Sequence, residues 1–417
     1  MRKFYNKAQK MMNLENLAYL TVAGLPLYLV KVSFFGFLSN VLEILEALVL
    51  FIWLLDKKYP KPRASELMKT HKKYLFSIGL IIFGLIISTW LNGNYRVGLG
   101  IIKGWFVLPA LFTGAVLSIF DRDKALNIFK VFFASALAVS LAALGCFFSG
   151  QLTYDGRLTG PFNSPNYLAM YLSPALITGL MLARSQRVKV KNKNYNFGKL
   201  YYAGCVIIMA SLYLTYSYAA WSAVIISLII AETITNRRNI LKSKVFWGGI
   251  FLTVLLFFSQ WNSGKLQDAY TFAERSSLSS RLMIWKTGGK LAKDNLLWGI
   301  GPGNFQAKYL EYQKFYPPYL EWAVPHPHNL YLAFLLQAGL PGLAGFILFL
   351  FFWLADVWRM ERSALRTIVL ATMFYILIHG LVDTTYFKND LAIIFWLNFL
   401  ILSQKKLASK TPVTSHG

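Results

Sequence analysis

The chain has 417 residues, of which 56% are hydrophobic, 16% are aromatic and only 15% are charged. This composition is typical of a membrane protein and excludes a soluble enzyme. The formal net charge is +25, but many basic residues form short clusters between apolar runs of membrane-spanning length. This arrangement favours orientation in a membrane over nucleic-acid binding. Cys146 and Cys205 both lie in apolar runs, so the sequence predicts neither a disulfide framework nor a cysteine metal site.

Apolar runs long enough to cross a membrane, at roughly 20 residues per helix, recur along the chain. The first follows a basic segment and lacks a clear small-residue cleavage site, so we interpret it as an uncleaved helix. The runs lie at about 14–30, 35–55, 74–91, 97–120, 126–148, 166–183, 200–217, 219–234, 245–260, 328–357, 367–387 and 390–404.

The basic residues between these runs set the orientation. With both termini in the cytoplasm, 29 of the 43 Lys and Arg residues fall on the cytoplasmic side. Short cytoplasmic loops carry this excess of Lys and Arg in membrane proteins. The sequence therefore predicts an all-α polytopic membrane protein with about 12 transmembrane helices.

The longest connection, residues 261–327, lies on the external side between the ninth and tenth helices and is too long for a simple link. It predicts a helix from Ser280 to about Lys293, a Gly/Pro turn at Trp298–Asn304 and a second helix at Gln306–Tyr316. The expected domains are 1–260 with nine membrane helices, 261–327 as an external loop domain, 328–404 with three membrane helices, and 405–417 as a flexible cytoplasmic tail.

A broken helix is predicted after His328. The run contains Ala338-Gly-Leu-Pro-Gly342, and a proline there removes a backbone hydrogen bond and clashes with the preceding turn. The first half of this helix begins at the external surface, directly after Val324-Pro-His-Pro327. Its free N–H groups and positive dipole suit an anion.

The external face carries the groups that suggest chemistry. We find no Walker loop, dinucleotide fingerprint, HExxH motif or nucleophile elbow, and the external face has no access to cytoplasmic ATP, so the energy for a reaction must come from the substrate itself. The face instead holds His328 beside Asn329, together with Arg281 and Arg157. Arginine binds phosphate oxygens bidentately, and histidine exchanges a proton near neutral pH. This set suits displacement at a sugar that carries a diphosphate leaving group.

Each of these residues also has a simpler interpretation. His328 beside prolines is compatible with a loop or capping residue, and Arg281 with a surface charge or a lipid headgroup contact. Arg157 is compatible with a residue that holds its own loop through carbonyl contacts.

Ionisable residues inside the predicted spans suggest a function of another class. Such residues are costly in a membrane and are functional candidates. Glu43 and Glu46 share one helix face, as a proton-coupled transporter would require. The other members of this set, to which no role is assigned, are Lys103, His379 and Asp383.

Four segments resemble the O-antigen ligase and polymerase superfamily, bacterial membrane glycosyltransferases that act on lipid-linked glycans outside the plasma membrane. They follow in the same order as in the family and lie on the predicted external face. They are Arg157–Asn166, Arg281–Trp285, Asn295–Phe305, and His328–Leu332 followed by Gln337–Leu343.

The resemblance implies an inverting transferase that takes a preassembled glycan from undecaprenyl diphosphate without metal, nucleotide or cofactor. His328 would be the base that activates the acceptor hydroxyl, and Arg281 would hold the diphosphate. Asn329 and His326 would support this site.

The chain departs from the family at one position. Where a Ser-Arg pair is expected, it has Ser217-Tyr218, so a second arginine for the diphosphate is missing there. Arg157 or Arg275 is a candidate replacement, and Tyr218 itself offers a weaker neutral hydrogen bond.

The acceptor decides between related activities. A sugar of the lipid A core would make the protein an O-antigen ligase, and the end of another lipid-linked chain would make it a polymerase; a protein or wall polymer is a further option. The His-Asn segment and the long loop late in the chain favour the ligase. The expected location is the bacterial plasma membrane, with the site on the external face, the donor, acceptor and bilayer as partners, and no nucleic acid.

Overall fold

The computed structural model describes residues 13–34, 37–59, 61, 64–185, 187–190, 193–196, 198–236, 244–264, 267, 276–316 and 324–404. The predicted tail at 405–417 lies outside these residues.

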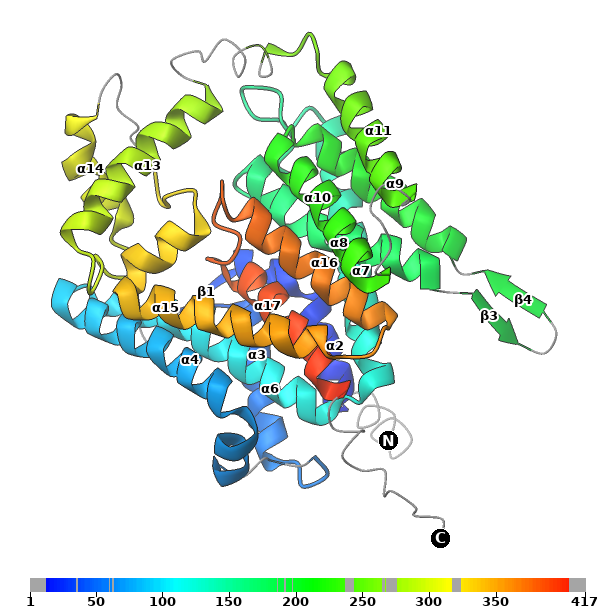
Figure 1. The fold of residues 1–417 in the computed structure, drawn as a ribbon, viewed down its shortest axis with the longest axis horizontal. Helices are drawn as coiled ribbons and strands as arrows, with labels where there is room; N and C mark the ends of the chain where they lie inside the picture. Colours follow the sequence, from blue (N-terminus) through cyan, green and yellow to red (C-terminus); the bar gives the residue numbers. More distant parts are fainter. Residues whose placement is uncertain are drawn as a thin grey trace.

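The described chain is a helical bundle (Figure 1). Several helices begin at an Asn, Asp or Ser whose side chain accepts a hydrogen bond from a first-turn N–H group, as N-cap residues do. The elements are α2 (Leu14–Ala23), η1 (Leu25–Leu29), β1 (Lys31–Phe34), β2 (Phe37–Asn40), α3 (Val41–Leu55), α4 (Ala64–Asn92), α5 (Tyr95–Ile101), η2 (Ile102–Val107), α6 (Leu108–Ile119), α7 (Arg122–Phe148), α8 (Pro165–Ser185), β3 (Arg187–Val190), β4 (Lys193–Asn196), α9 (Gly198–Leu214), α10 (Tyr218–Asn236), α11 (Lys244–Ser259), α13 (Ser277–Asp294), α14 (Phe305–Tyr312), η4 (Gln313–Phe315), α15 (Leu330–Trp358), α16 (Ala364–His379), α17 (Asn389–Leu397) and η5 (Asn398–Gln404).

Membrane-spanning helices are a main feature of the fold. Each predicted apolar run contains a helix, and among the described residues six helical stretches are long and apolar enough to cross a membrane. The helical, multi-pass membrane class is therefore confirmed, while the count of 12 stays a prediction. The six stretches are His71–Asn92, Tyr95–Ile119, Lys124–Phe148, Pro165–Ser185, Tyr218–Thr235 and Leu330–Trp358.

Helix α8 lies at the centre of the bundle. The apolar stretch of α8 is 78% buried, whereas that of α4 is 39% buried. The difference arises because α7, α9, α10 and α16 all pack against α8. The outer helices keep large apolar side chains on their surfaces, such as Phe76, Phe251 and Phe351. Apolar surface of this kind suits contact with lipid. The residues at the start of α8 are thus held by neighbours on several sides.

Helices α4 and α15 run side by side along the bundle (Figure 1). The predicted break in α15 is confirmed and falls at Gly339, whose φ is 64°. Leu340 N–H bonds to the carbonyl oxygens of Leu296 and Leu297, and Ile300 N–H bonds to that of Leu336. The Gly/Pro turn therefore packs directly against the broken helix.

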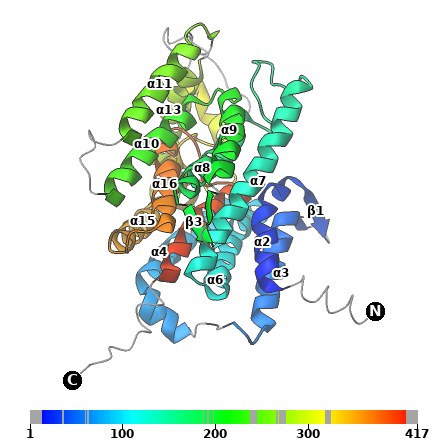
Figure 2. The ribbon, with the colours of Figure 1, turned by 90° about the vertical axis from the view of Figure 1, so that its right-hand side faces the viewer.

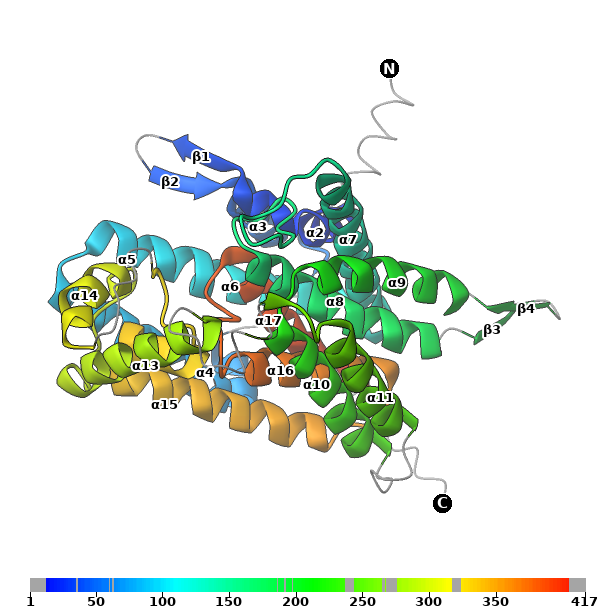
Figure 3. The same ribbon diagram turned by 90° about the horizontal axis from the view of Figure 1, so that it is seen from above.

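Two antiparallel hairpins, β1–β2 and β3–β4, project from the helical body (Figure 3) and were not predicted. The first lies beside α2 and α3 (Figure 2). The predicted span at 35–55 therefore begins as a strand, and its helix starts only at Val41, which Asn40 caps. An apolar run alone does not separate a strand from a helix.

The long connection contains the predicted helices. Helix α13 begins one turn earlier than expected, because Ser276 rather than Ser280 is the N-cap and accepts a hydrogen bond from Ser279 N–H. Helix α14 continues into η4, and the two together correspond to the second predicted helix. Helix α13 packs against α14 and α15. This packing joins the long connection to the start of α15.

Candidate functional site

The centre of the site is the loop at residues 380–388. The predicted span at 367–387 is too long, because α16 ends at His379. Three successive carbonyl oxygens of this loop, at residues 380–382, each accept one hydrogen bond. The donors are Leu330 N–H at 2.7 Å, Asn329 Nδ2 at 2.8 Å and Arg281 Nε at 2.8 Å. The start of α15 and the helix α13 thus fix the position of the next residue in the loop.

That next residue is Asp383, whose side chain is 2% exposed. Its carboxylate lies 3.1 Å from His328 Nδ1 and accepts hydrogen bonds from Asn166 Nδ2 at 3.1 Å and from Thr384 N–H at 2.8 Å. Arg281 Nη2 lies 3.7 Å from it. Burial alone would raise the pKa of Asp383, but the charge and hydrogen bond of His328 and the charge of Arg281 outweigh it and hold that pKa well below its usual range. Asp383 is therefore a carboxylate.

His328 is held in one orientation by its neighbours. Its φ is 45°, in the left-handed region that is uncommon for residues other than glycine and is often found at functional sites. Trp285 Nε1 donates a hydrogen bond to the His328 carbonyl oxygen at 3.1 Å, and Asn329 caps α15 directly after it. The His328 side chain is 29% exposed, so the ring is fixed on one side and accessible on another.

Arg281 lies in the first turns of α13, where its side chain is 16% exposed. Its Nε bonds to Val382, and its Nη1 bonds to the carbonyl oxygen and hydroxyl of Ser277. Within the described part of the chain, its Nη2 faces the Asp383 carboxylate at 3.7 Å. The guanidinium is thus anchored at one edge and keeps donor capacity beside His328.

Arg157 reaches the same region from the loop before α8. Its Nε donates to the Thr215 carbonyl oxygen at 2.8 Å, and its Nη2 donates to Asn166 Oδ1 at 2.8 Å. Burial lowers the pKa of Arg157, Asp155 opposes this shift, and the like charge of Arg281 lowers the pKa further. Arg157 therefore connects its own loop to Thr215 just after the end of α9 and to Asn166 at the start of α8. It also lies close enough to Arg281 for the two charges to interact.

The other two candidates for the diphosphate have different outcomes. Tyr218 begins α10, and its hydroxyl lies 3.2 Å from the Ser263 hydroxyl and 3.4 Å from Gln260 Oε1. Arg275 lies outside the described residues.

His326 belongs to a second cluster next to the first. Its Nε2 lies 2.8 Å from the Tyr167 hydroxyl, and Lys388 Nζ lies 3.2 Å from the centre of the Tyr167 ring. Burial lowers the pKa of His326 to about 4, and the charge of His328 adds to this shift. Burial also lowers the pKa of Lys388 to about 8, against the opposing charge of Asp390. His326 is thus neutral near pH 7 and positions this wall of the site.

The acidic pair on α3 does not form one cluster. Glu43 pairs with Lys103 on the π-helix η2 at 2.7 Å and accepts a hydrogen bond from Asn389 Nδ2 at 2.8 Å. Glu46 is fully buried, and neither of its carboxyl oxygens has a hydrogen-bond partner among the residues described. The Glu43 contacts hold α3, η2 and α17 together, so they support the fold and do not form a pair with Glu46.

Three residues of the site were not assigned a role from the sequence: Asp383, Asn166 and Lys388. In the sequence, Asp383 stands out only as an ionisable residue in an apolar run, and Asn166 only as the last residue of the Arg157–Asn166 segment. Nothing in the local sequence indicates that both contact the region around His328 and Arg281. The hydrogen bond between Asn166 and Asp383, for example, joins residues that are 217 positions apart in the sequence.

The arrangement can perform acid–base chemistry beside positive charge. An ionised carboxylate only accepts hydrogen bonds, so in the neutral imidazole His328 Nδ1 carries the proton and Nε2 keeps a free lone pair. A base of this kind, beside two arginines, can remove a proton from a hydroxyl while an anion binds nearby.

One segment of the chain, about a third of its length, matches a known family. Residues 203–347 match the family model described as O-antigen ligase. This segment contains both Arg281 and His328, and it ends before Asp383. No curated protein shows a significant match to the chain. The match at residues 203–347 supports the O-antigen ligase superfamily predicted from the sequence motifs.

Proposed function

We propose that the protein transfers a glycan from undecaprenyl diphosphate to an acceptor hydroxyl on the external face of the bacterial plasma membrane, with inversion and without a metal. The acceptor proposed first is a sugar of the lipid A core, as in an O-antigen ligase. The family match supports a transferase of the ligase and polymerase type. The donor, the acceptor and the side of the membrane are part of the proposal.

The observation that carries this proposal is the contact between Asp383 and His328 at 3.1 Å. A buried carboxylate that holds one ring nitrogen of a histidine orients the ring and stabilises the imidazolium that forms when the other nitrogen takes a proton. A capping histidine needs no such partner. The contact therefore favours a base over the simpler interpretation of His328.

The reaction is a single displacement. The acceptor oxygen attacks the anomeric carbon and forms the new C–O bond, while His328 Nε2 takes the proton of the hydroxyl. The bond between the anomeric carbon and the diphosphate oxygen breaks, and its electron pair leaves with undecaprenyl diphosphate. Attack from the side opposite the leaving group inverts the anomeric configuration and needs one base and no covalent enzyme intermediate.

The diphosphate would bind near Arg281. The free edge of its guanidinium matches the geometry of phosphate oxygens, and positive charge there stabilises the charge that develops on the leaving group. Arg157 adds a second positive charge that interacts with the first. We propose that this pair replaces the arginine that the family places at the position of Tyr218.

Reconstitution of the purified full-length protein tests the proposal. The protein in liposomes is mixed with undecaprenyl-diphosphate glycan and a lipid A core acceptor, in the presence of EDTA and without ATP. Products are followed by gel and mass spectrometry, with His328→Ala as the loss-of-function variant. Glycan attached to the core acceptor by the wild-type protein alone is the expected result.

Other outcomes change the proposal in defined ways. A ladder of longer undecaprenyl-linked chains would identify a polymerase and overturn the choice of acceptor. Equal turnover by a folded His328→Ala protein would overturn the base. No product from either acceptor, with a folded wild-type protein, would overturn the proposed function as a whole.

A further inference from the structure

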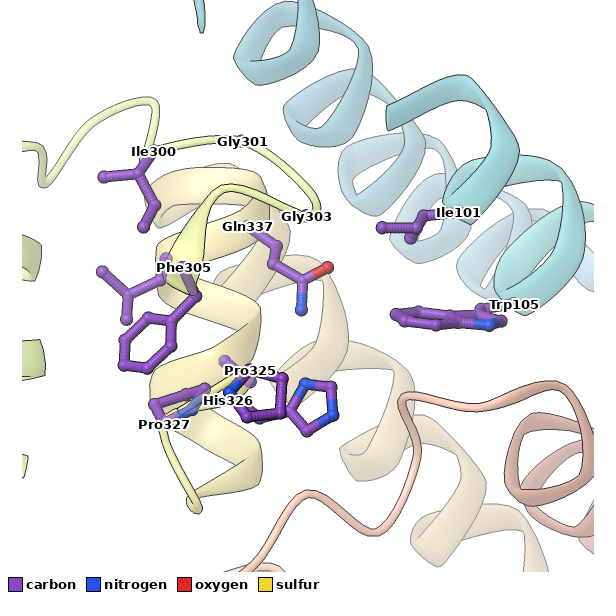
Figure 4. A pocket seen from close by; sticks show the side chains of 12 residues that line it. Ile101, Trp105, Ile300, Gly301, Gly303, Phe305, Pro325, His326, Pro327 and Gln337 are labelled. Carbon is purple, nitrogen blue, oxygen red and sulfur yellow. The ribbon is translucent and has the colours of Figure 1, made fainter. Parts of the chain in front are cut away.

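A cavity of about 50 Å³ opens between η2, the turn before α14 and the segment that leads to His328 (Figure 4). One wall carries Ile101 and Trp105, and the opposite wall carries Phe305 and Gln337. A volume of this size holds about three or four water molecules, or a part of a small ligand with the same volume. The cavity is therefore large enough to accept part of a sugar ring.

Gln337 is a polar side chain that points into this space. Its amide reaches from α15 toward Trp105 (Figure 4), and the residue is only 9% exposed. Its Oε1 has no hydrogen-bond partner among the described residues. A buried acceptor left without a partner costs about 1–3 kcal/mol, so such an atom calls for a donor that the described residues do not supply.

Trp105 supplies apolar surface on the other side. Its Nε1 donates to Asn389 Oδ1 at 3.3 Å, so the indole N–H is already used and the ring presents carbon atoms to the cavity. Tryptophan combines a large rigid surface with a π face that attracts the positive edges of C–H bonds. This surface suits the apolar face of a sugar ring.

The lining also excludes an anion as the preferred occupant. None of the twelve lining residues is Lys, Arg, Asp or Glu, and the only titratable one is His326. A mostly apolar pocket with a few placed polar groups is typical of a site for a neutral ligand. A diphosphate would instead favour the arginines described above. The lining of the cavity therefore favours an uncharged ligand over an anion.

The position of the cavity connects it to the transfer site. Pro325, His326 and Pro327 form part of its lining and directly precede His328. The residue that holds Trp105, Asn389, directly follows Lys388 of the loop that carries Asp383. A sugar that binds here lies beside the candidate base.

We propose that this cavity is a sugar subsite, in which a ring hydroxyl donates a hydrogen bond to Gln337 Oε1 and a C–H face of the pyranose packs on Trp105. The inference rests on the proposed function, because it assigns to that function the place where one sugar of the donor or acceptor glycan is held. It adds a binding site to the base and the arginines.

Sugar binding is measured first without turnover. The full-length protein in nanodiscs is examined by saturation-transfer NMR with methyl glucoside, methyl galactoside and methyl N-acetylglucosaminide. We expect at least one of these to receive saturation from the wild-type protein and from His328→Ala. The signal should fall severalfold in Gln337→Leu and in Trp105→Leu. Gln306→Leu, on α14 outside the cavity lining, is the matched control and should keep the signal.

Steady-state kinetics then show which sugar is held. In Gln337→Leu, we expect the KM for one glycan substrate to rise about 2-fold to 10-fold, the range for one neutral hydrogen bond. A rise for the donor places the donor sugar in the cavity, and a rise for the acceptor places the acceptor sugar there. An unchanged KM for both would overturn the subsite.

The two proposals fail in different ways. Sugar saturation that depends on Gln337, in a protein without transferase activity, would overturn the proposed function and keep the subsite. Active transfer with no saturation of any of the three glycosides, or with equal saturation of a folded Gln337→Leu protein, would overturn the subsite, since water alone would then fill the cavity.

Discussion

Asp383 binds His328 across 3.1 Å and thereby joins the loop after α16 to the start of α15. Because Asp383 is ionised, it fixes the tautomer of the neutral histidine and leaves Nε2 free. The carboxylate is itself positioned by three neighbours, Asn166, Thr384 and Arg281. The reactivity of His328 should therefore depend on residues that do not touch the substrate.

Asp383→Asn should reduce kcat about 100-fold or more while the protein stays folded. The amide keeps the size of the side chain but cannot stabilise an imidazolium, and general-base catalysis contributes about 100-fold to 10,000-fold. Initial rates with saturating donor and acceptor measure the effect. Asp294→Asn, at the surface pair with Lys290, is the control and should keep wild-type activity. A wild-type kcat for Asp383→Asn would show that the contact serves structure alone.

Arg281→Lys should raise the KM for the donor about 10-fold, and Arg281→Ala should raise it further. Lysine keeps the charge but loses the planar fork and the Nε bond to Val382 that aims it. Titration of the lipid-linked donor at constant acceptor gives the KM values, with Arg359→Lys, at the far end of α15, as the control. If Arg281→Lys behaves like the wild type, the guanidinium does not bind the diphosphate.

The sequence predicts one half of this site and not the other. His328 and Arg281 belong to local motifs with a fixed order, and the predicted break after Gln337 follows from a proline in an apolar run. Asp383 was placed inside a span, because hydropathy does not show that α16 ends at His379. The pairing of Asp383 with His328 is a tertiary contact, which no local pattern encodes. Strand β2 was missed for a related reason, since a short apolar run fits a strand and a helix equally.

His326 should make the protein less stable in mild acid. Its pKa is about 4 in the folded protein, against about 6.5 for an ordinary histidine. Between these values the unfolded chain binds a proton that the folded chain does not, so the free energy of unfolding falls as pH drops from 6.5 to 4. The group therefore contributes stability above pH 6.5 that is lost toward pH 4.

His326→Gln should remove this dependence. We expect the loss of stability between pH 7 and pH 4.5 to shrink by on the order of 1–3 kcal/mol, seen as a smaller drop in apparent Tm in detergent. His71→Gln, at the kink of α4, is the matched variant outside this cluster and should follow the wild type. Parallel Tm curves for His326→Gln and the wild type would contradict the shifted pKa.

Gly339→Ala should destabilise the protein by about 1–3 kcal/mol or more, the range for a residue forced into a sparsely populated backbone conformation. The φ of 64° disfavours alanine, and an added Cβ would overlap the carbonyl oxygen of Leu297. Thermal unfolding followed by size-exclusion chromatography measures the change. Gly114→Ala, where a Cβ meets no atom within 4 Å, should be neutral or slightly stabilising. Equal stability of the two variants would mean that the break in α15 does not need glycine.

Glu43 and Glu46 separate the transferase from a proton-coupled transporter. Glu43→Gln removes the carboxylate that pairs with Lys103, whose side chain is 42% exposed, and should lower the apparent Tm slightly. Glu46→Gln places a neutral side chain of the same shape where the described residues offer the carboxyl oxygens no hydrogen bond, so it should leave stability and transfer near wild-type values. Transfer assays and proton flux in proteoliposomes are measured on the same samples. Proton flux in the wild type that disappears in Glu46→Gln, together with absent glycan transfer, would favour the transporter, because a glycosyltransferase needs no proton path through α3.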